Sequence, residues 1–288
     1  MKVRVGLLMA LLCLGVSAFS QSPQEKFATV FGAKVRYLEA GDPAKPAVIL
    51  LHGMGGNADA AWPLTVPALA ANYRVIAPDL LGFGKSDKPM INYRIGFYVD
   101  FLDKLMSELK VEKVSLVGNS MGGWISVLYA TKYPEKASKL VLVDAGGYAP
   151  PAGFDYGKLA VTMNPSTRES VKAGMKLLFY NSAMFQSDAA ADSLLAARIA
   201  ANDGYTIQTL IRNAQYADEY FDDEVKALKH PTLIVWGKQD GITPVTEGER
   251  LKKDIAGSEL VIFDQAGHAP QFEKAADFNK KLLEFLAK

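Results

Sequence analysis

A serine with a glycine two positions away on either side is the first candidate for chemistry in this chain of 288 residues. In the segment Gly118-Asn119-Ser120-Met121-Gly122, an apolar run precedes the serine and a helical pattern follows it. A G-x-S-x-G pattern between a strand and a helix indicates a nucleophile elbow. Such a turn strains the serine backbone and exposes its oxygen at the edge of a sheet, and the glycines let the chain close around it. We therefore predict that Ser120 is a nucleophile.

The chain contains three histidines that could accept the serine proton, and a serine hydroxyl needs such a base to react. His268 follows the last apolar run, in "FDQAGHAPQFE", and is the predicted base. His52 precedes a glycine-rich loop and is predicted to hold that loop, while His230 before Pro231 is predicted to be a loop residue. His52 lacks a second histidine or carboxylate at metal-ligand spacing, so we predict no metal site. No cofactor is expected either.

An acidic side chain must orient the base and stabilise its cationic form. Asp240, in "GKQDGITP", follows an apolar run by a few residues and is the predicted acid. Asp144, in "LVLVDAGG", ends the preceding run and is the alternative, because a carboxylate there could also reach the base. With Asp240 the three groups occur in the order serine, aspartate, histidine.

Backbone N–H groups must meet the negative oxygen that develops during acyl transfer, and losing one donor can cost about 3 kcal/mol. Met121 follows the nucleophile and is one predicted donor. Met54, in the loop "HGMGG", is the other. We predict that the substrate contacts neighbours of these groups, namely Gly53, Asn119 and Trp124, although core packing is the alternative for this tryptophan and for Trp62.

Short, nearly continuous apolar runs predict strands that are buried on both faces, as in parallel sheets. They cover residues 47–51, 73–78, 113–118, 139–144, 232–237 and 259–264. Segments with helical spacing lie between them, including 98–110, 124–133 and 278–288. This alternation predicts an α/β sheet with helices on both faces. An alternating pattern around Gly32 predicts an additional hairpin.

One interval interrupts the alternation of strands and helices. Residues 146–228 contain no convincing strand, a proline-rich entry and several helical stretches. We predict that they form a helical cap over the carboxyl edge of the sheet. The core domain would then consist of residues 21–145 and 229–288.

The composition predicts a folded domain with a small or neutral substrate. Hydrophobic residues make up 49% of the chain, and 32 basic residues balance 31 acidic ones, so no nucleic-acid partner is expected. Residues 1–20 begin with two cations and continue with a short apolar run and small residues, the pattern of a secretory signal peptide. The single cysteine, Cys13, lies in this leader. We expect a periplasmic or secreted protein with no stable membrane anchor after cleavage.

The segments "HGMGG", "DLLGFGKS", "GNSMGG", "GKQD" and "GHAPQFE", in this order, resemble the α/β-hydrolase superfamily over essentially the whole mature chain. The resemblance implies an eight-stranded, mostly parallel sheet with a helical cap after the sixth strand. It also implies a catalytic triad of Ser120, Asp240 and His268. Asp79 and Gly82 are expected to build a sharp turn after a strand.

The serine nucleophile favours hydrolysis of small or medium carboxylic esters through an acyl-enzyme. Haloalkane dehalogenases and epoxide hydrolases resemble this chain but carry aspartate at the nucleophile position, and dienelactone hydrolases use cysteine. A catalytically idle binding protein on the same scaffold is a further alternative, which the complete triad disfavours.

The main alternative is a carbon–carbon bond hydrolase that resembles the meta-cleavage product hydrolases of aromatic catabolism. Arg198 falls where those enzymes place a cap arginine that binds a substrate carboxylate. Ala269 follows the predicted base, where those enzymes typically have tryptophan, and both residues are candidates for substrate contact. Their substrates also arise inside the cell, which disagrees with a signal peptide. From the sequence we therefore favour an ester substrate.

Overall fold

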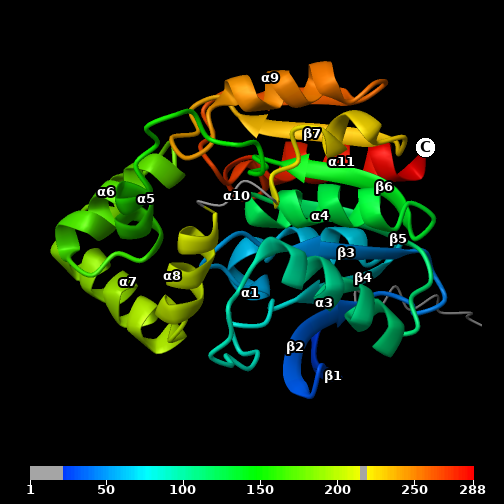
Figure 1. Ribbon diagram of the computed structural model, residues 1–288, viewed down its shortest axis with the longest axis horizontal. Coiled ribbons are helices and arrows are strands. Elements are labelled where there is room, and N and C mark those ends of the chain that lie inside the picture. Colours follow the sequence, from blue (N-terminus) through cyan, green and yellow to red (C-terminus); the bar gives the residue numbers. More distant parts are fainter. Residues whose placement is uncertain (1–21, 215–218) are drawn as a thin grey trace, which may run out of the picture.

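The computed structural model describes residues 22–214 and 219–288, so the predicted leader lies outside the described residues. Eight strands form one sheet in the order β1-β2-β4-β3-β5-β6-β7-β8, with helices on both faces and a helical cap (Figure 1). This arrangement confirms the predicted fold class. The strands are β1 (Gln24–Val30), β2 (Ala33–Ala40), β3 (Ala47–Leu51), β4 (Arg74–Pro78), β5 (Val114–Asn119), β6 (Ala137–Val143), β7 (Thr232–Gly237) and β8 (Glu259–Phe263).

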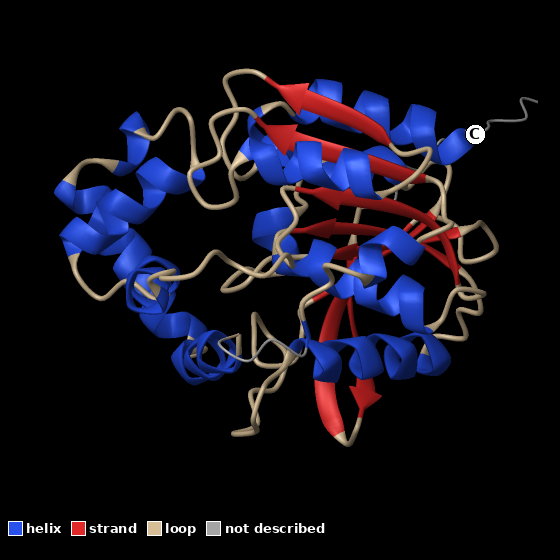
Figure 2. Cartoon of the chain, turned by 45° about the horizontal axis from the view of Figure 1, so that its top comes forward, coloured by secondary structure: helices blue, strands red, loops and turns tan. Residues whose placement is uncertain are grey.

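The first two strands form the predicted hairpin, and the sheet becomes parallel after β2. β1 pairs with β2, and β2 pairs with β4, both antiparallel, while the pairs from β4 through β3, β5, β6 and β7 to β8 are parallel. Parallel neighbours need crossover connections, which place helices on the faces of the sheet. One face carries α3 (Ile95–Glu108), α4 (Met121–Lys132) and α9 (Val245–Asp254), and the other carries α1 (Ala58–Ala61), α2 (Thr65–Leu69) and α11 (Ala275–Ala287) (Figure 2).

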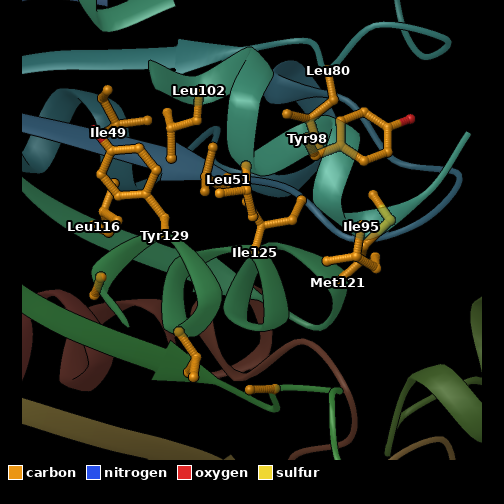
Figure 3. Packing of buried hydrophobic residues seen from close by; sticks show 14 of the residues in the cluster. Ile49, Leu51, Leu80, Ile95, Tyr98, Leu102, Leu116, Met121, Ile125 and Tyr129 are labelled. Atoms are coloured by element: carbon orange, nitrogen blue, oxygen red, sulfur yellow. The ribbon is translucent and has the colours of Figure 1, made fainter. Parts of the chain in front are cut away.

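Apolar packing fixes the helix that follows the predicted nucleophile. Ile125 and Tyr129 of α4 are fully buried in the same cluster as Ile49 of β3 and Leu102 of α3 (Figure 3). The side chain of Met121, the first residue of α4, belongs to this cluster and is only 3% exposed. Burial of each large apolar side chain contributes roughly 1.5–3 kcal/mol, so the start of α4 is held firmly against the sheet.

The last strand differs from the prediction that it is buried on both faces. All residues of β8 are at least partly exposed, and Ile262 is 40% exposed. The physical reason is its position, because β8 is an edge strand with only β7 as a neighbour.

The segment between β6 and β7 is helical. Its helices α5, α6 and α7 each begin at a side-chain N-cap, supplied by Asp155, Thr167 and Ser187. The arrowheads of β6 and β7 point towards this cap (Figure 1). The helices are α5 (Tyr156–Met163), α6 (Arg168–Leu178), α7 (Asp188–Ala201) and α8 (Gly204–Asn213), with short 3-10 helices η1 (Ala183–Phe185) and η3 (Glu224–Ala227). Within the described residues, no helix combines the length and apolar character needed to cross a bilayer.

Candidate active site

Ser120 occupies the strained turn predicted for it, between the end of β5 and the start of α4. Its backbone lies in a sparsely populated region, with φ 53° and ψ −117°. A Cβ added to Gly118 would lie 2.2 Å from the carbonyl oxygen of Gly122, and one added to Gly122 would lie 2.2 Å from the carbonyl oxygen of Leu51. Both flanking positions therefore require glycine for steric reasons.

His268 and Asp240 are in direct contact at the carboxyl edge of the sheet. The Nδ1 atom of His268 lies 2.7 Å from Oδ2 of Asp240, whose side chain is fully buried. Thr243 donates from Oγ1 to Oδ2 of Asp240 (2.7 Å), and the backbone N–H groups of Ile242 and Thr243 donate to Oδ1. A carboxylate held in this way fixes the histidine tautomer with hydrogen on Nδ1, which leaves Nε2 able to accept a proton. Of the two candidate acids, the structure brings Asp240 to the histidine.

Asn119 connects the predicted nucleophile to the predicted base. Its Nδ2 donates to the carbonyl oxygens of His268 (3.3 Å) and Val143 (3.2 Å). Ser120 and His268 form no direct side-chain hydrogen bond within the part of the chain that the structure describes. Catalytic hydrogen bonds are often long without substrate and tighten when it binds.

The "HGMGG" loop packs directly against the serine. A Cβ added to Gly53 would lie 3.1 Å from Cβ of Ser120. His52 supports this loop, because its Nε2 accepts a hydrogen bond from the N–H of Leu80 (3.0 Å) and its Nδ1 donates to the carbonyl oxygen of Gly53 (2.8 Å). Burial lowers the pKa of His52, so it is neutral in this position. These contacts support the predicted structural role of His52.

The two predicted oxyanion donors flank the serine. Met121 is the first residue of α4, where a helix offers its N–H no carbonyl partner. Met54 follows Gly53 on the loop packed against Ser120. Both N–H groups therefore lie on segments that meet at the serine.

Arg198 of the cap reaches the same loop. Its Nη1 donates to the carbonyl oxygen of Gly55 (3.3 Å), and its side chain is 14% exposed. The guanidinium also forms an ion pair with Asp203, whose side chain is 1% exposed. Sequence reasoning missed Asp203, and the only signal was its position just after the helix that carries Arg198. A substrate contact by Arg198 would have to share this cation with a buried carboxylate.

A cleft of about 300 Å³ opens one helical turn from the serine. Trp124 lines it together with Met54, and its indole N–H donates to the carbonyl oxygen of Glu219 (2.8 Å). The carboxylate of Glu219 accepts from the N–H groups at the start of α3 and pairs with Arg94. Sequence reasoning missed the contributions of Arg94 and Glu219, as well as those of Ile95, Leu210, Asn213 and Ala214.

The remaining predicted residues have separate places. Ala269 is partly buried directly after His268, at the start of α10 (Pro270–Glu273). Trp62 is fully buried in the core rather than in the cleft. Asp79 is buried, accepts from the N–H groups of Ala58 and Lys85, and supports the turn containing Gly82, where φ is 90°. These contacts support structural roles for Asp79 and Gly82.

Residues 22–214 and 219–288 contain no group of three or more histidine, cysteine, aspartate or glutamate side chains that could hold a metal ion. The contacts described above join a serine, a histidine, a carboxylate and backbone amides. This is the set of groups that nucleophilic acyl transfer uses.

Comparison with known proteins identifies the family. Residues 46–275 match the α/β hydrolase fold family, and the chain belongs to it. It is 34% identical over 254 residues, 84% of this chain and 87% of the relative, to a 2-hydroxy-6-oxononadienedioate/2-hydroxy-6-oxononatrienedioate hydrolase of Escherichia coli K12. The structure of the meta-cleavage product hydrolase CumD of Pseudomonas fluorescens IP01 superposes with a TM-score of 0.82 at 31% identity, covering 91% of this chain and 97% of CumD.

A lipase-like structure is also similar. A putative lipase from Acinetobacter baumannii AYE superposes with a TM-score of 0.81 at 28% identity, covering 92% of this chain and 91% of the lipase. The family membership makes the chain an α/β-fold hydrolase. The identity of the bond that it cleaves is a separate question.

Proposed function

We propose that the chain is a serine-dependent hydrolase that cleaves a carbon–carbon bond next to a ketone in a substrate that carries a carboxylate. The observation that supports this most is the guanidinium of Arg198, held by the cap 3.3 Å from the carbonyl oxygen of Gly55, one residue beyond the predicted oxyanion donor Met54. The relatives from Escherichia coli and Paraburkholderia xenovorans are named as hydrolases of oxo-dioates, which contain both groups. This proposal reverses the preference for esters drawn from the sequence.

The proposed reaction begins with proton transfer from Ser120 to Nε2 of His268. The serine oxygen attacks the ketone, and the N–H groups of Met54 and Met121 stabilise the oxyanion that forms. The carbon–carbon bond then breaks, and its electron pair leaves with the departing carbon. The imidazolium of His268 returns the proton to this fragment. Water, activated by the same histidine, releases the acid from the acyl-enzyme.

A carbon leaving group must delocalise its electron pair. A conjugated, vinylogous carbonyl accomplishes this, and a carboxylate attached to it carries a negative charge that a guanidinium can orient. A cation over the loop next to Ser120 is therefore more useful for such a substrate than for a neutral ester.

Ester hydrolysis is the second candidate, and one observation favours it. The buried carboxylate of Asp203 already pairs with Arg198, so this cation is satisfied without an anionic substrate. The same serine, histidine and amides would form and hydrolyse an acyl-enzyme from an ester. The structural likeness to the putative lipase is in line with this candidate.

A substrate panel tests the proposal. Turnover of p-nitrophenyl esters of rising acyl length is compared with that of a dienoate carrying a vinylogous ketone and a carboxylate. We expect kcat/KM for the dienoate to exceed that of every ester by at least about 100-fold, and Ser120→Ala to lower it by about a millionfold. Higher kcat/KM for the esters would select the second candidate.

A pair of arginine variants tests the carrying observation. Arg198→Ala should lower kcat/KM for the dienoate by about 10- to 100-fold, the value of a charge-assisted hydrogen bond, with less than about threefold change for esters. Arg168→Ala is the matched control, because Arg168 is a cap arginine that pairs with Asp192 on the surface. An equal loss on both substrate classes would show that Arg198 only maintains the loop.

We also propose that the chain is exported, on the strength of the leader-like residues 1–20 alone. Fractionation of cells that produce the full-length chain with a C-terminal tag tests this. A product in the periplasm, shortened near Ala18 or Ser20, supports export. A full-length cytoplasmic product contradicts it.

A further inference from the structure

Asp144 is a buried acid next to the proposed triad that the reaction described above does not use. It directly follows β6, and its side chain is fully buried. Oδ1 accepts a hydrogen bond from the N–H of Gly237 (2.8 Å). Oδ2 is also buried and has no hydrogen-bond donor among the described residues. A carboxylate oxygen in this position would carry uncompensated negative charge.

Several contacts bring Asp144 to Asp240. Gly237 donates its N–H to Asp144, and its carbonyl oxygen accepts from the N–H of Asp240 (3.2 Å). The hydroxyl of Thr243 lies 3.2 Å from the carbonyl oxygen of Asp144 and 2.7 Å from Oδ2 of Asp240. Two acids on neighbouring strands thus share one closed site, in which the second ionisation is strongly disfavoured.

We propose that Asp144 is a protonated carboxylic acid that donates a hydrogen bond to Asp240 and so positions the acid that orients His268. Asp240 is the member of the pair that remains ionised, because it alone has donors on both oxygens. The proton on Asp144 keeps the pair at a single negative charge. Asp144 is thus a positioning residue that acts through Asp240.

The electrostatics of the site agree with this geometry. Burial raises the pKa of Asp144 well above its usual range, and the charge and hydrogen bond of Asp240 add to the effect. Glu273 of α10 acts in the same direction. His268 contacts Asp240 rather than Asp144. The charged groups that act on Asp144 are therefore carboxylates, which favour its neutral form.

Infrared spectroscopy tests the protonation state without requiring turnover. The carbonyl stretch of a protonated carboxylic acid should be present in the wild-type spectrum at neutral pH and absent in Asp144→Asn. Asparagine keeps the acceptor for Gly237 and a donor for Asp240, and it tolerates the left-handed backbone at this position, where φ is 44°. A wild-type spectrum without this band would overturn the proposal.

The pH profile of kcat/KM tests the positioning role, and this part rests on the proposed hydrolase function. It is measured on whichever substrate class is turned over, so the identity of the substrate does not affect the result. With a neutral Asp144, Asp144→Asn should leave the midpoint of the acid limb unchanged. Asp144→Ala removes a donor from Asp240, strengthens its negative charge at His268 and should move the midpoint to higher pH.

An ionised Asp144 would give the opposite shifts. Both variants would then remove a negative charge, and the midpoint would move to lower pH by about a unit or more. That result overturns the proposal. If Asp144→Ala does not fold, the infrared band and the Asp144→Asn profile decide. A chain that shows the band but turns over no substrate would contradict the proposed function and leave the protonated acid in place.

Discussion

Nδ2 of Asn119 donates a hydrogen bond to the carbonyl oxygen of His268 across 3.3 Å, joining residues 149 positions apart in the sequence. Asn119 directly precedes the predicted nucleophile, and its second hydrogen bond, to the carbonyl oxygen of Val143, ties it to β6. The end of β5 therefore fixes the loop that carries the predicted base. Sequence analysis placed Asn119 in contact with substrate, whereas these bonds give its amide a role in holding the site together.

Replacement of Asn119 should therefore impair catalysis more than folding. Asn119→Ala leaves two carbonyl oxygens without their donor and should lower kcat by about tenfold or more. Asn119→Asp places a carboxylate against both oxygens and should lower it further. We would measure kcat and the melting temperature for both variants. A kcat for Asn119→Ala within twofold of wild type would show that His268 is held without this bond.

Gly53 should tolerate no side chain for functional reasons. The Cβ of Gly53→Ala would lie 3.1 Å from Cβ of Ser120, so the oxyanion loop or the serine must shift. We expect a loss in kcat of about 100-fold, because a displacement of this kind spoils the alignment of reacting groups. Gly146→Ala is the control, since no atom lies within 4 Å of its added Cβ. Equal activities of the two variants would contradict this account.

The core of the fold was predictable because its signals are local. The runs 47–51 and 232–237 are β3 and β7 as the structure has them, since strands that are buried on both faces must be continuously apolar. The elbow at Ser120 was predictable for a similar reason, because only glycine fits at two fixed positions around it.

Other parts of the site depend on contacts between distant segments. Asp144 and Asp240 both follow strands, and only the 2.7 Å contact with His268 separates them. Glu219 contacts the start of α3 from 124 residues away, and neither residue type nor spacing indicates this. Asp203 was missed because a carboxylate after a helix is usually solvated.

Glu273 should couple the cap to the loop of the predicted base. Its Oε2 accepts from the N–H of Gly267 (2.7 Å) and its Oε1 accepts from the N–H of Asn181 in the cap (3.3 Å). Glu273→Ala leaves both donors unpaired, so we expect a loss in kcat of about tenfold. Glu273→Gln can keep one acceptor and should be intermediate. Steady-state kinetics on both variants check this order, and a larger loss for glutamine than for alanine would contradict it.

His52 should make the stability of the chain fall in mild acid. Burial lowers its pKa in the folded state, whereas in the unfolded chain the value is near 6.5. As the pH falls below about 6.5, the unfolded state binds a proton that the folded state does not, so the free energy of unfolding decreases by up to about 1.4 kcal/mol per pH unit. Above that pH both states are neutral at this residue, and the effect vanishes.

His52→Gln isolates this contribution to stability. Oε1 of glutamine can replace Nε2 as the acceptor for Leu80 and does not titrate, while all other ionisable groups are shared with the wild type. Urea unfolding at pH 7.5, 6.5 and 5.5 should show the wild type losing stability relative to the variant as the pH falls. A difference between the two proteins that stays constant over this range would mean that His52 is protonated equally in both states, and its role as a neutral support of the oxyanion loop would have to be abandoned.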